Sequence, residues 1–202
     1  PRVGFPAVLG LASAAEVVTD LSRRLGAEVF EIPTLPPSVP GLRLQSVLRQ
    51  AIIGAGGRIL DNMEVVSLSP AGDDRIAAVA AAAARRQRYG AKAAVLATGG
   101  ILGGGVVGSP DGRLTEAVAG LEVAGPTSRS GWFDREVGET YPVFTAGVRA
   151  GGDLRPGAAH LPGVYVAGGL LAGADPLGEG SLEGISLATG IRAGRLAAGR
   201  GT

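Results

Sequence analysis

Two short apolar runs in this sequence each end in a pair of glycines: Val95-Leu-Ala-Thr-Gly-Gly100 and Val164-Tyr-Val-Ala-Gly-Gly169. Apolar runs of this length predict buried strands of a parallel sheet. Paired glycines at the end of a strand leave no side chain between the backbone and whatever lies beside it. In open α/β sheets, ligands bind just beyond the carboxyl ends of the strands. The two runs therefore predict an α/β fold with a ligand at the strand ends.

The second run continues through a Gly-rich loop into a helix of small residues, expected over residues 182–198. We expect Gly180 and Ser181 to open this helix, because no proline blocks the N–H groups of its first turn. Such a helix start favours an anion or an electron-rich carbonyl. Small residues also allow a helix to pack closely on a sheet without any ligand, so both interpretations stay open.

Residues 103–108 match the dinucleotide-binding pattern G-x-G-x-x-G in form only. The pattern requires a helix that begins at its third glycine and points at a pyrophosphate. Here Ser109-Pro110-Asp111-Gly112 follows, and these residues favour a turn. We therefore interpret this segment as a turn region and not as a nucleotide site.

The N-terminal third of the chain alternates helical and extended patterns. Residues 10–32 predict a helix, with Ser13 as its N-cap and Gly26 as its end, followed by a strand. Residues 33–41 contain four prolines and predict an extended crossing between subdomains. A helix is then expected over residues 42–55, followed by short strands at 58–60 and 64–68.

Residues 76–84 are almost entirely alanine, and their propensity alone favours a helix. The turn residues Gly72-Asp73-Asp74 before them favour a hairpin instead, and we predict a strand. Residues 103–150 are rich in glycine, proline and charge and are more typical of a cap or lid than of a core.

Composition excludes several classes of function. Hydrophobic residues make up 46% of the chain, charged residues 18%, and the net charge is +1, which predicts a soluble globular protein and gives no basis for nucleic-acid binding. The chain has no Cys and one His, His160, so we expect no metal site and no iron–sulfur cluster in it. The longest apolar run, residues 76–84, is far shorter than the roughly 20 residues of a membrane span.

Residues 95–100, 164–169 and 180–190 together resemble the C-terminal half of FAD-dependent oxidoreductases of the fumarate reductase type. Within that group the sequence is similar to the family of B subunits of anaerobic glycerol-3-phosphate dehydrogenases, over nearly all 202 residues. The specific segments are Ile32-Pro-Thr-Leu-Pro-Pro-Ser-Val-Pro-Gly-Leu-Arg-Leu44, Ser128-Arg-Ser-Gly-Trp-Phe133 and Ala174-Asp-Pro-Leu-Gly-Glu-Gly180.

The resemblance implies a partial flavin-binding, Rossmann-like domain of the glutathione reductase type, with a β-hairpin and an inserted cap or substrate subdomain. Residues 41–105 and 151–202 would belong to the flavin-binding domain, and residues 1–40 and 106–150 to the cap. The hairpin supports a strand at residues 76–84. The strand–GxGxxG–helix that binds pyrophosphate is absent, which, with the start at Pro1, predicts the C-terminal half of a longer protein.

The cofactor implied by the resemblance is FAD or FMN. The backbone of Val65 would contact the adenine end of a dinucleotide, and Gly168 and Gly169 would touch the ribityl–phosphate region. Many relatives carry an acid at the position of Gly169, and glycine cannot make the side-chain hydrogen bond that such an acid makes. The remaining residues would line the groove or place the last helix beside the isoalloxazine: Thr98, Gly99, Gly100, Glu179, Gly180, Ser181 and Leu182.

The reaction implied by the resemblance is oxidation of sn-glycerol 3-phosphate, a phosphorylated polyol, to dihydroxyacetone phosphate. Electrons would pass through partner subunits to a quinone. A phosphate needs cations, so Arg129 and Arg135 are candidates for binding it, and His160 is a candidate general base. A solvated surface position is the alternative for either arginine.

Two other functions stay open. The chain could be a non-catalytic flavin-carrying or structural subunit that relays electrons, with any iron–sulfur relay in other chains. It could also be a related flavoenzyme that acts on another substrate, such as a dicarboxylate or a steroid. The expected location is cytoplasmic, with peripheral attachment to the inner membrane through partner subunits left open.

Overall fold

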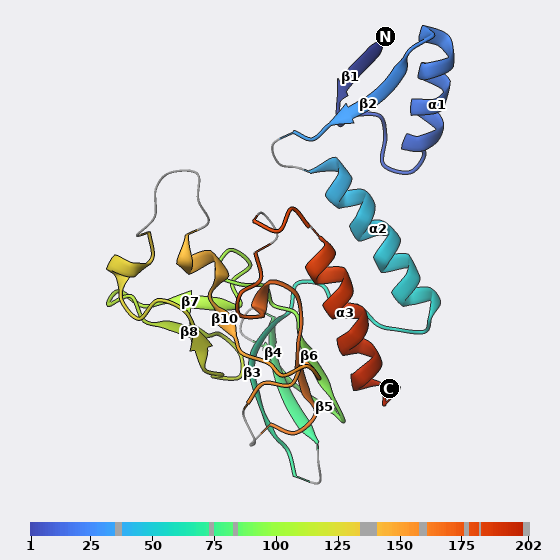
Figure 1. Cartoon of the computed structure of the whole chain (residues 1–202). Coiled ribbons are helices and arrows are strands. Elements are labelled where there is room, and N and C mark those ends of the chain that lie inside the picture. Colours follow the sequence, from blue (N-terminus) through green and yellow to red (C-terminus); the bar gives the residue numbers. More distant parts are fainter. Residues whose placement is uncertain are drawn as a thin grey trace. The chain divides into compact units, whose positions relative to one another are not determined.

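The chain forms two compact units, Pro1–Asp61 and Asn62–Thr202, and Figure 1 labels most of their helices and strands. The computed structural model describes residues 1–34, 38–72, 75–82, 85–133, 141–157, 161–175, 178–181 and 183–199. Within these ranges, helices and strands alternate in the first unit, and the second unit contains consecutive strands followed by a helix, which confirms the mixed α/β class. No helix in this described part of the chain has the length and hydrophobicity needed to cross a membrane.

The first unit is built around two parallel strands, β1 (Arg2–Pro6) and β2 (Glu28–Ile32), paired from Arg2–Glu28 to Pro6–Ile32. Helix α1 (Ala14–Leu25) makes the crossover between them, as a parallel pair requires. Gly26 ends α1 in the left-handed conformation, with φ of 59°, and its N–H donates to the Ser22 carbonyl. The helix and strand predicted for residues 10–32 are confirmed, although the Ser13 side chain makes no capping hydrogen bond.

Helix α2 (Val39–Gly54) begins three residues earlier than the sequence predicted. The Ser38 hydroxyl caps it by accepting the Gly41 N–H at 3.1 Å. Pro40 lies in the first turn, where its missing N–H has no intrahelical acceptor to lose. The extended crossing predicted for residues 33–41 is therefore wrong over its last three residues, while residues 35–37 lie outside the described ranges.

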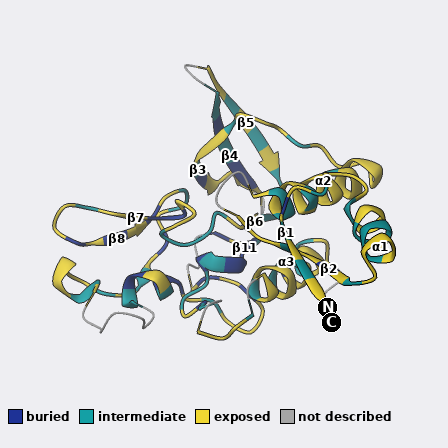
Figure 2. Ribbon diagram, turned by 90° about the horizontal axis from the view of Figure 1, so that it is seen from above, coloured by how far each residue is buried: buried dark blue, intermediate teal, exposed yellow. Residues whose placement is uncertain are grey.

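The second unit opens with an antiparallel sheet of three strands, β3 (Glu64–Pro70), β4 (Ile76–Ala82) and β5 (Arg85–Ala91). The alanine-rich segment is thus a strand, as predicted, because β3 and β5 pair with it on both sides. Tertiary pairing overrides the helix propensity of alanine here. The strand predicted at residues 58–60 is wrong, since that segment has no regular structure. Figure 2 shows the buried positions of β4 in dark blue.

Strands β6 (Ala94–Leu96) and β11 (Val164–Val166) pair in parallel with Tyr165 opposite Val95. The two apolar runs therefore form strands as predicted; β11 is fully buried, whereas in β6 only Leu96 is buried and Val95 is exposed. Helix α3 (Gly184–Ala197) packs against both strands and against the short helix η3 (Gly168–Leu170) that follows β11. This parallel pair with its helix is compatible with a Rossmann-like arrangement, which stays a prediction.

The segment between β6 and β11 contributes to the same core. Its short elements are β7 (Val106–Gly108), β8 (Leu114–Glu116), β9 (Val123–Ala124), η1 (Arg129–Gly131), η2 (Pro142–Thr145) and β10 (Gly147–Val148). Val106, Leu114 and Val143 are buried in one cluster with Leu96 and Val166. The assignment of residues 1–40 and 106–150 to a cap stays a prediction, and the boundary between the compact units follows Asp61.

One ion pair fixes the loop between β1 and α1 in the first unit. Arg43 of α2 donates to both carboxylate oxygens of Glu31 and to the Gly10 carbonyl, and Leu9 N–H donates to the same carboxylate at 2.9 Å. The two side chains are only 20% and 13% exposed. The hydrogen bonds from Arg43 and then from Leu9 hold the pKa of Glu31 at about 2, below its ordinary value of 4.5.

This pair predicts an acid-sensitive contribution to stability. Because the folded-state pKa of Glu31 is depressed, its stabilisation is present above about pH 4.5 and is lost as the pH falls toward 2. We expect Glu31→Gln to lower the midpoint of thermal unfolding at pH 7. The difference in midpoint between the variant and the wild type should disappear as the pH falls from about 4.5 to about 2. Circular dichroism measured during heating at a series of pH values tests both expectations.

The matched control for this experiment is Glu28→Gln on the same strand. Glu28 pairs with Arg2 at 2.7 Å, but both of these side chains are well exposed, so little stability should be lost. A difference between Glu31→Gln and the wild type that stays constant from pH 7 to pH 2 would contradict the prediction.

Candidate functional site

The two strand–Gly–Gly segments meet at their carboxyl ends. Because β6 and β11 are adjacent and parallel, Gly100 and Gly169 lie at the same edge of the pair. A Cβ atom on Gly100 would lie 2.7 Å from the Gly169 carbonyl oxygen, and one on Gly169 would lie 3.3 Å from the Gly100 nitrogen. The backbones therefore approach so closely that glycine is required at Gly100.

The chain after β6 folds back tightly on itself. Gly99 has a φ of 75°, and a Cβ on it would lie 3.0 Å from the Gly103 Cα. The N–H groups of Gly105 and Val106 both donate to the Gly100 carbonyl, at 3.1 and 3.3 Å. The G-x-G-x-x-G segment thus closes a turn and leads into the β7–β8 hairpin, which confirms that it does not open a helix.

Helix α3 begins at Gly184, with Glu183 as its N-cap, so the prediction that Gly180 and Ser181 open it is wrong. Gly180 adopts a left-handed φ of 63°, which is incompatible with a helix. The Gly184 N–H donates to the Ser181 carbonyl at 2.7 Å, in the turn that precedes the helix. Glu179 and Gly180 are exposed in this turn, and Leu182 lies outside the described residues.

The first half of α3 is held on the end of β11 by polar contacts. The Gly168 N–H donates to the Thr189 hydroxyl at 2.8 Å, and that hydroxyl donates to the Ile185 carbonyl at 2.6 Å. A Cβ atom on Gly168 would lie 3.3 Å from the Ser186 hydroxyl oxygen. Neither Thr189 nor Ser186 was predicted as a site residue, because their role depends on packing between segments far apart in the sequence.

Two hydroxyl groups near these segments are buried without a hydrogen-bond partner among the described residues. They are Thr98 Oγ1, just after β6, and Ser181 Oγ, in the turn before α3. Buried polar groups in proteins nearly always have a partner, so an unpaired one needs an explanation. Both residues are among those predicted to contact a flavin, and a ligand with polar edges would supply the missing partners. This part of the structure therefore fits the predicted cofactor.

The other predicted site residues are placed as follows. Val65 is exposed on β3, where the pairing with β4 shifts register between Val65 and Ser67. Arg129 begins η1, and its guanidinium carbon lies 5.6 Å from the centroid of the Trp132 ring. His160 and Arg135 lie outside the described residues.

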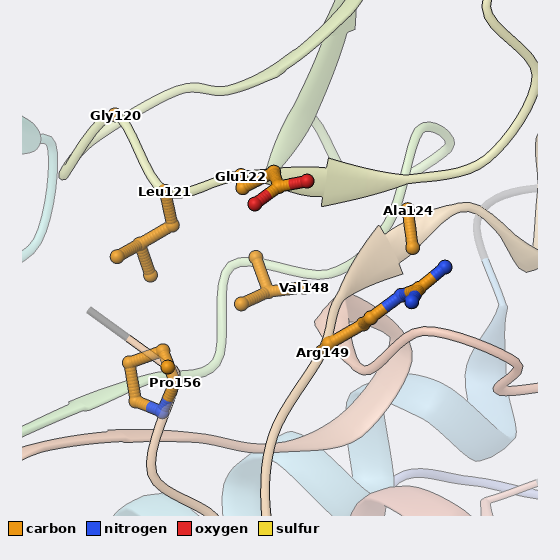
Figure 3. A pocket seen from close by; sticks show the side chains of 8 residues that line it. Gly120, Leu121, Glu122, Ala124, Val148, Arg149 and Pro156 are labelled. Atoms are coloured by element: carbon orange, nitrogen blue, oxygen red, sulfur yellow. The ribbon is translucent and has the colours of Figure 1, made fainter.

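A cavity of about 470 Å³ lies between the chain before β9 and the chain after β10. Leu121, Val148 and Pro156 contribute apolar side chains to its lining, as Figure 3 shows. Glu122 and Arg149 also line the cavity, and in Figure 3 the Arg149 side chain extends toward Ala124 and away from the Glu122 carboxylate. No local sequence pattern predicts these two lining residues, because the cavity forms between segments that are separated along the chain.

The loop that forms one wall of this cavity is fixed by a buried carboxylate. Glu116, at the end of β8, is only 4% exposed. Its two carboxylate oxygens accept the N–H groups of Val118, Ala119 and Leu121, at 3.0, 2.6 and 3.4 Å. These bonds satisfy the buried charge and order the backbone from Glu116 to Leu121.

Comparison with known proteins identifies a family. The model of the family described as "FAD binding domain" matches residues 1–187. A protein of Halobacterium salinarum, named as the probable B subunit of anaerobic glycerol-3-phosphate dehydrogenase, is 40% identical over 201 residues, which are 98% of this chain and 47% of that protein. A protein of Pectobacterium carotovorum, named as the B subunit of the same dehydrogenase, is 36% identical over 189 residues, 93% of this chain and 44% of that protein.

More distant relatives carry the same name. The protein of Vibrio cholerae is 27% identical over 193 residues, 94% of this chain and 44% of that protein. The chain thus spans less than half the length of these curated relatives. The resemblance that the sequence motifs predicted is confirmed.

The contact between the strand ends gives a prediction about stability. A methyl group at Gly100 would lie 2.7 Å from a backbone oxygen, so the two strand ends must separate to admit it. We expect Gly100→Ala to lower the free energy of unfolding by about 1–3 kcal/mol, as overpacking does. Denaturation in urea, followed by circular dichroism, measures this change.

Gly190→Ala is the matched control. Gly190 lies within α3, where a Cβ atom would meet no described atom within 4 Å. Alanine has the higher helix propensity, so this variant should gain about 0.5–1 kcal/mol. Similar changes of the same sign in the two variants would show that the close approach at Gly100 does not constrain the fold.

Proposed function

Because the chain belongs to the family of FAD-binding domains, we propose that the ends of β6 and β11 and the start of α3 form part of the FAD site of a flavin-dependent dehydrogenase. FAD, one of the two flavins that the sequence left open, is the cofactor that family membership supports. The observation that carries the proposal is that the hydroxyls of Thr98, just after β6, and Ser181, in the turn before α3, are buried without a hydrogen-bond partner among the described residues.

In this proposal, different residues contact different parts of the cofactor. The backbones of Gly168 and Gly169 approach the ribityl–phosphate region, and the backbone of Val65 approaches the adenine end. The rest line the groove or the isoalloxazine edge: Thr98, Gly99, Gly100, Glu179, Gly180, Ser181 and Leu182. FAD, when bound, supplies the capacity to accept a hydride from a carbon atom.

The substrate we propose is sn-glycerol 3-phosphate. Support comes from the relatives, whose names describe the B subunit of an anaerobic glycerol-3-phosphate dehydrogenase. Oxidation to dihydroxyacetone phosphate removes a hydride from C2 and a proton from the C2 hydroxyl. Arg129 and Arg135 would bind the phosphate, and His160 would accept the proton.

The start of α3 would favour this redox chemistry through electrostatics. The N-terminus of a helix carries partial positive charge and stabilises negative charge placed beside it. Such charge develops on a flavin ring when it is reduced, so a ring next to Gly184 would be easier to reduce. Partner subunits would then carry the electrons to a quinone, and a cytoplasmic location with attachment to the membrane through those subunits belongs to the same proposal.

Absorbance spectroscopy tests the proposed function. We expect the purified protein to retain a visible flavin band after incubation with FAD and desalting. Anaerobic addition of glycerol 3-phosphate should bleach that band without any partner protein. A retained band that bleaches only when a partner is added would favour an electron-relay role, and bleaching by a dicarboxylate or a steroid instead would assign another substrate. Failure to retain FAD would contradict a cofactor site in this chain.

Two arginines allow a sharper test of the phosphate contact. In the assembled, FAD-loaded enzyme, Arg129→Gln should raise the KM for glycerol 3-phosphate about tenfold or more while kcat changes little, because a charge-assisted bond to phosphate is lost. Arg149→Gln is the matched control, since Arg149 is also exposed and lines the cavity near β10. Steady-state kinetics give the KM of both variants. A larger rise in KM for Arg149→Gln than for Arg129→Gln would contradict the proposed contact and place the substrate in that cavity instead.

A further inference from the structure

Thr189 is the only described side chain of α3 that hydrogen-bonds to the backbone at the end of β11. Its hydroxyl makes two bonds at once. It accepts the Gly168 N–H at 2.8 Å and donates to the Ile185 carbonyl, one turn earlier in its own helix, at 2.6 Å. A single hydroxyl therefore joins the first turn of α3 to the backbone at the strand end.

The surroundings leave this contact little freedom. Gly168 is buried and holds a φ of 67°, a conformation that side chains rarely allow. Ser186 lies on the same side, 3.3 Å from where a Cβ atom of Gly168 would be. Farther along the same helix, Ala193 is fully buried against Tyr165 and Ala167, so α3 is packed on both sides of the bond to Thr189.

We infer that Thr189 is a positioning residue for the cofactor site: it fixes the Gly168 backbone and, with it, the place where α3 begins. This inference rests on the proposed FAD site, because Thr189 itself would act only through Gly168 and through the helix start. No alternative acceptor for the Gly168 N–H is found among the described residues. Without the hydroxyl, a buried donor would be left unpaired and the turn would move to find another partner.

The test compares two substitutions at Thr189. Thr189→Val keeps the shape of the side chain and removes the hydroxyl, whereas Thr189→Ser keeps the hydroxyl and removes the methyl group. We expect Thr189→Val to speed amide hydrogen exchange at Gly168 about tenfold, and to weaken FAD binding by about the same factor, as the loss of one buried hydrogen bond predicts. Thr189→Ser should restore both to within about twofold of the wild type.

The matched control is Thr19→Val in α1. The Thr19 hydroxyl makes the same bond to the carbonyl four residues earlier, Ala15, at 2.8 Å, but this threonine is exposed and lies in the first compact unit. Thr19→Val therefore removes the intrahelical bond alone. It should leave both FAD affinity and exchange at Gly168 unchanged.

The two measurements separate this inference from the function on which it rests. Exchange at Gly168 is measured in the flavin-free protein by NMR, and FAD affinity is measured by titration of the flavin absorbance. Unchanged exchange in Thr189→Val would overturn the inference, and so would a Thr189→Ser variant that binds FAD as weakly as Thr189→Val. A wild-type chain that takes up no FAD would overturn the proposed cofactor site, while exchange at Gly168 still decides whether Thr189 fixes the turn.

Discussion

The close approach of two backbones, at Gly100 and Gly169, is the constraint on which the second unit depends. β6 and β11 can lie in parallel and end at the same edge only if no side chain stands between Gly100 and the Gly169 carbonyl. η3 then begins at Gly168, and α3 packs on it through Ser186 and Thr189. The protein therefore needs small residues here for its own packing, before any ligand is considered. For this reason the glycines alone are weak support for a cofactor, and the unpartnered hydroxyls are stronger.

The parts of the fold that the sequence predicted are those encoded by local pattern. Both strands of the parallel pair follow from apolar runs that end in glycine, and Gly26 marked the end of α1. The alanine-rich strand β4 was harder, because its residues favour a helix when isolated. The turn residues before it indicated a hairpin. Pairing with β3 and β5 on both sides stabilises the strand and outweighs the helix propensity of alanine.

The errors and omissions have a common physical cause. Pro40 is compatible with a loop or with the first turn of a helix, and only the cap by Ser38 decides for the helix. Gly180 is compatible with a helix start or with a left-handed turn. Thr189 gains its partner Gly168 from helix packing, and Arg149 lines a cavity formed by segments separated along the chain. A single sequence carries no pattern for contacts of this kind.

The buried hydroxyls of Thr98 and Ser181 connect the packing of the chain with its proposed function. A hydroxyl removed from water without a partner costs free energy, so the folded protein gains stability when a partner arrives. The curated relatives are more than twice as long as this chain, and either FAD or further protein could supply that partner. In the proposed site, FAD is the ligand that would supply a partner to these hydroxyls. Its binding would then stabilise the fold in proportion to its affinity, and the same contacts would serve both folding and cofactor capture.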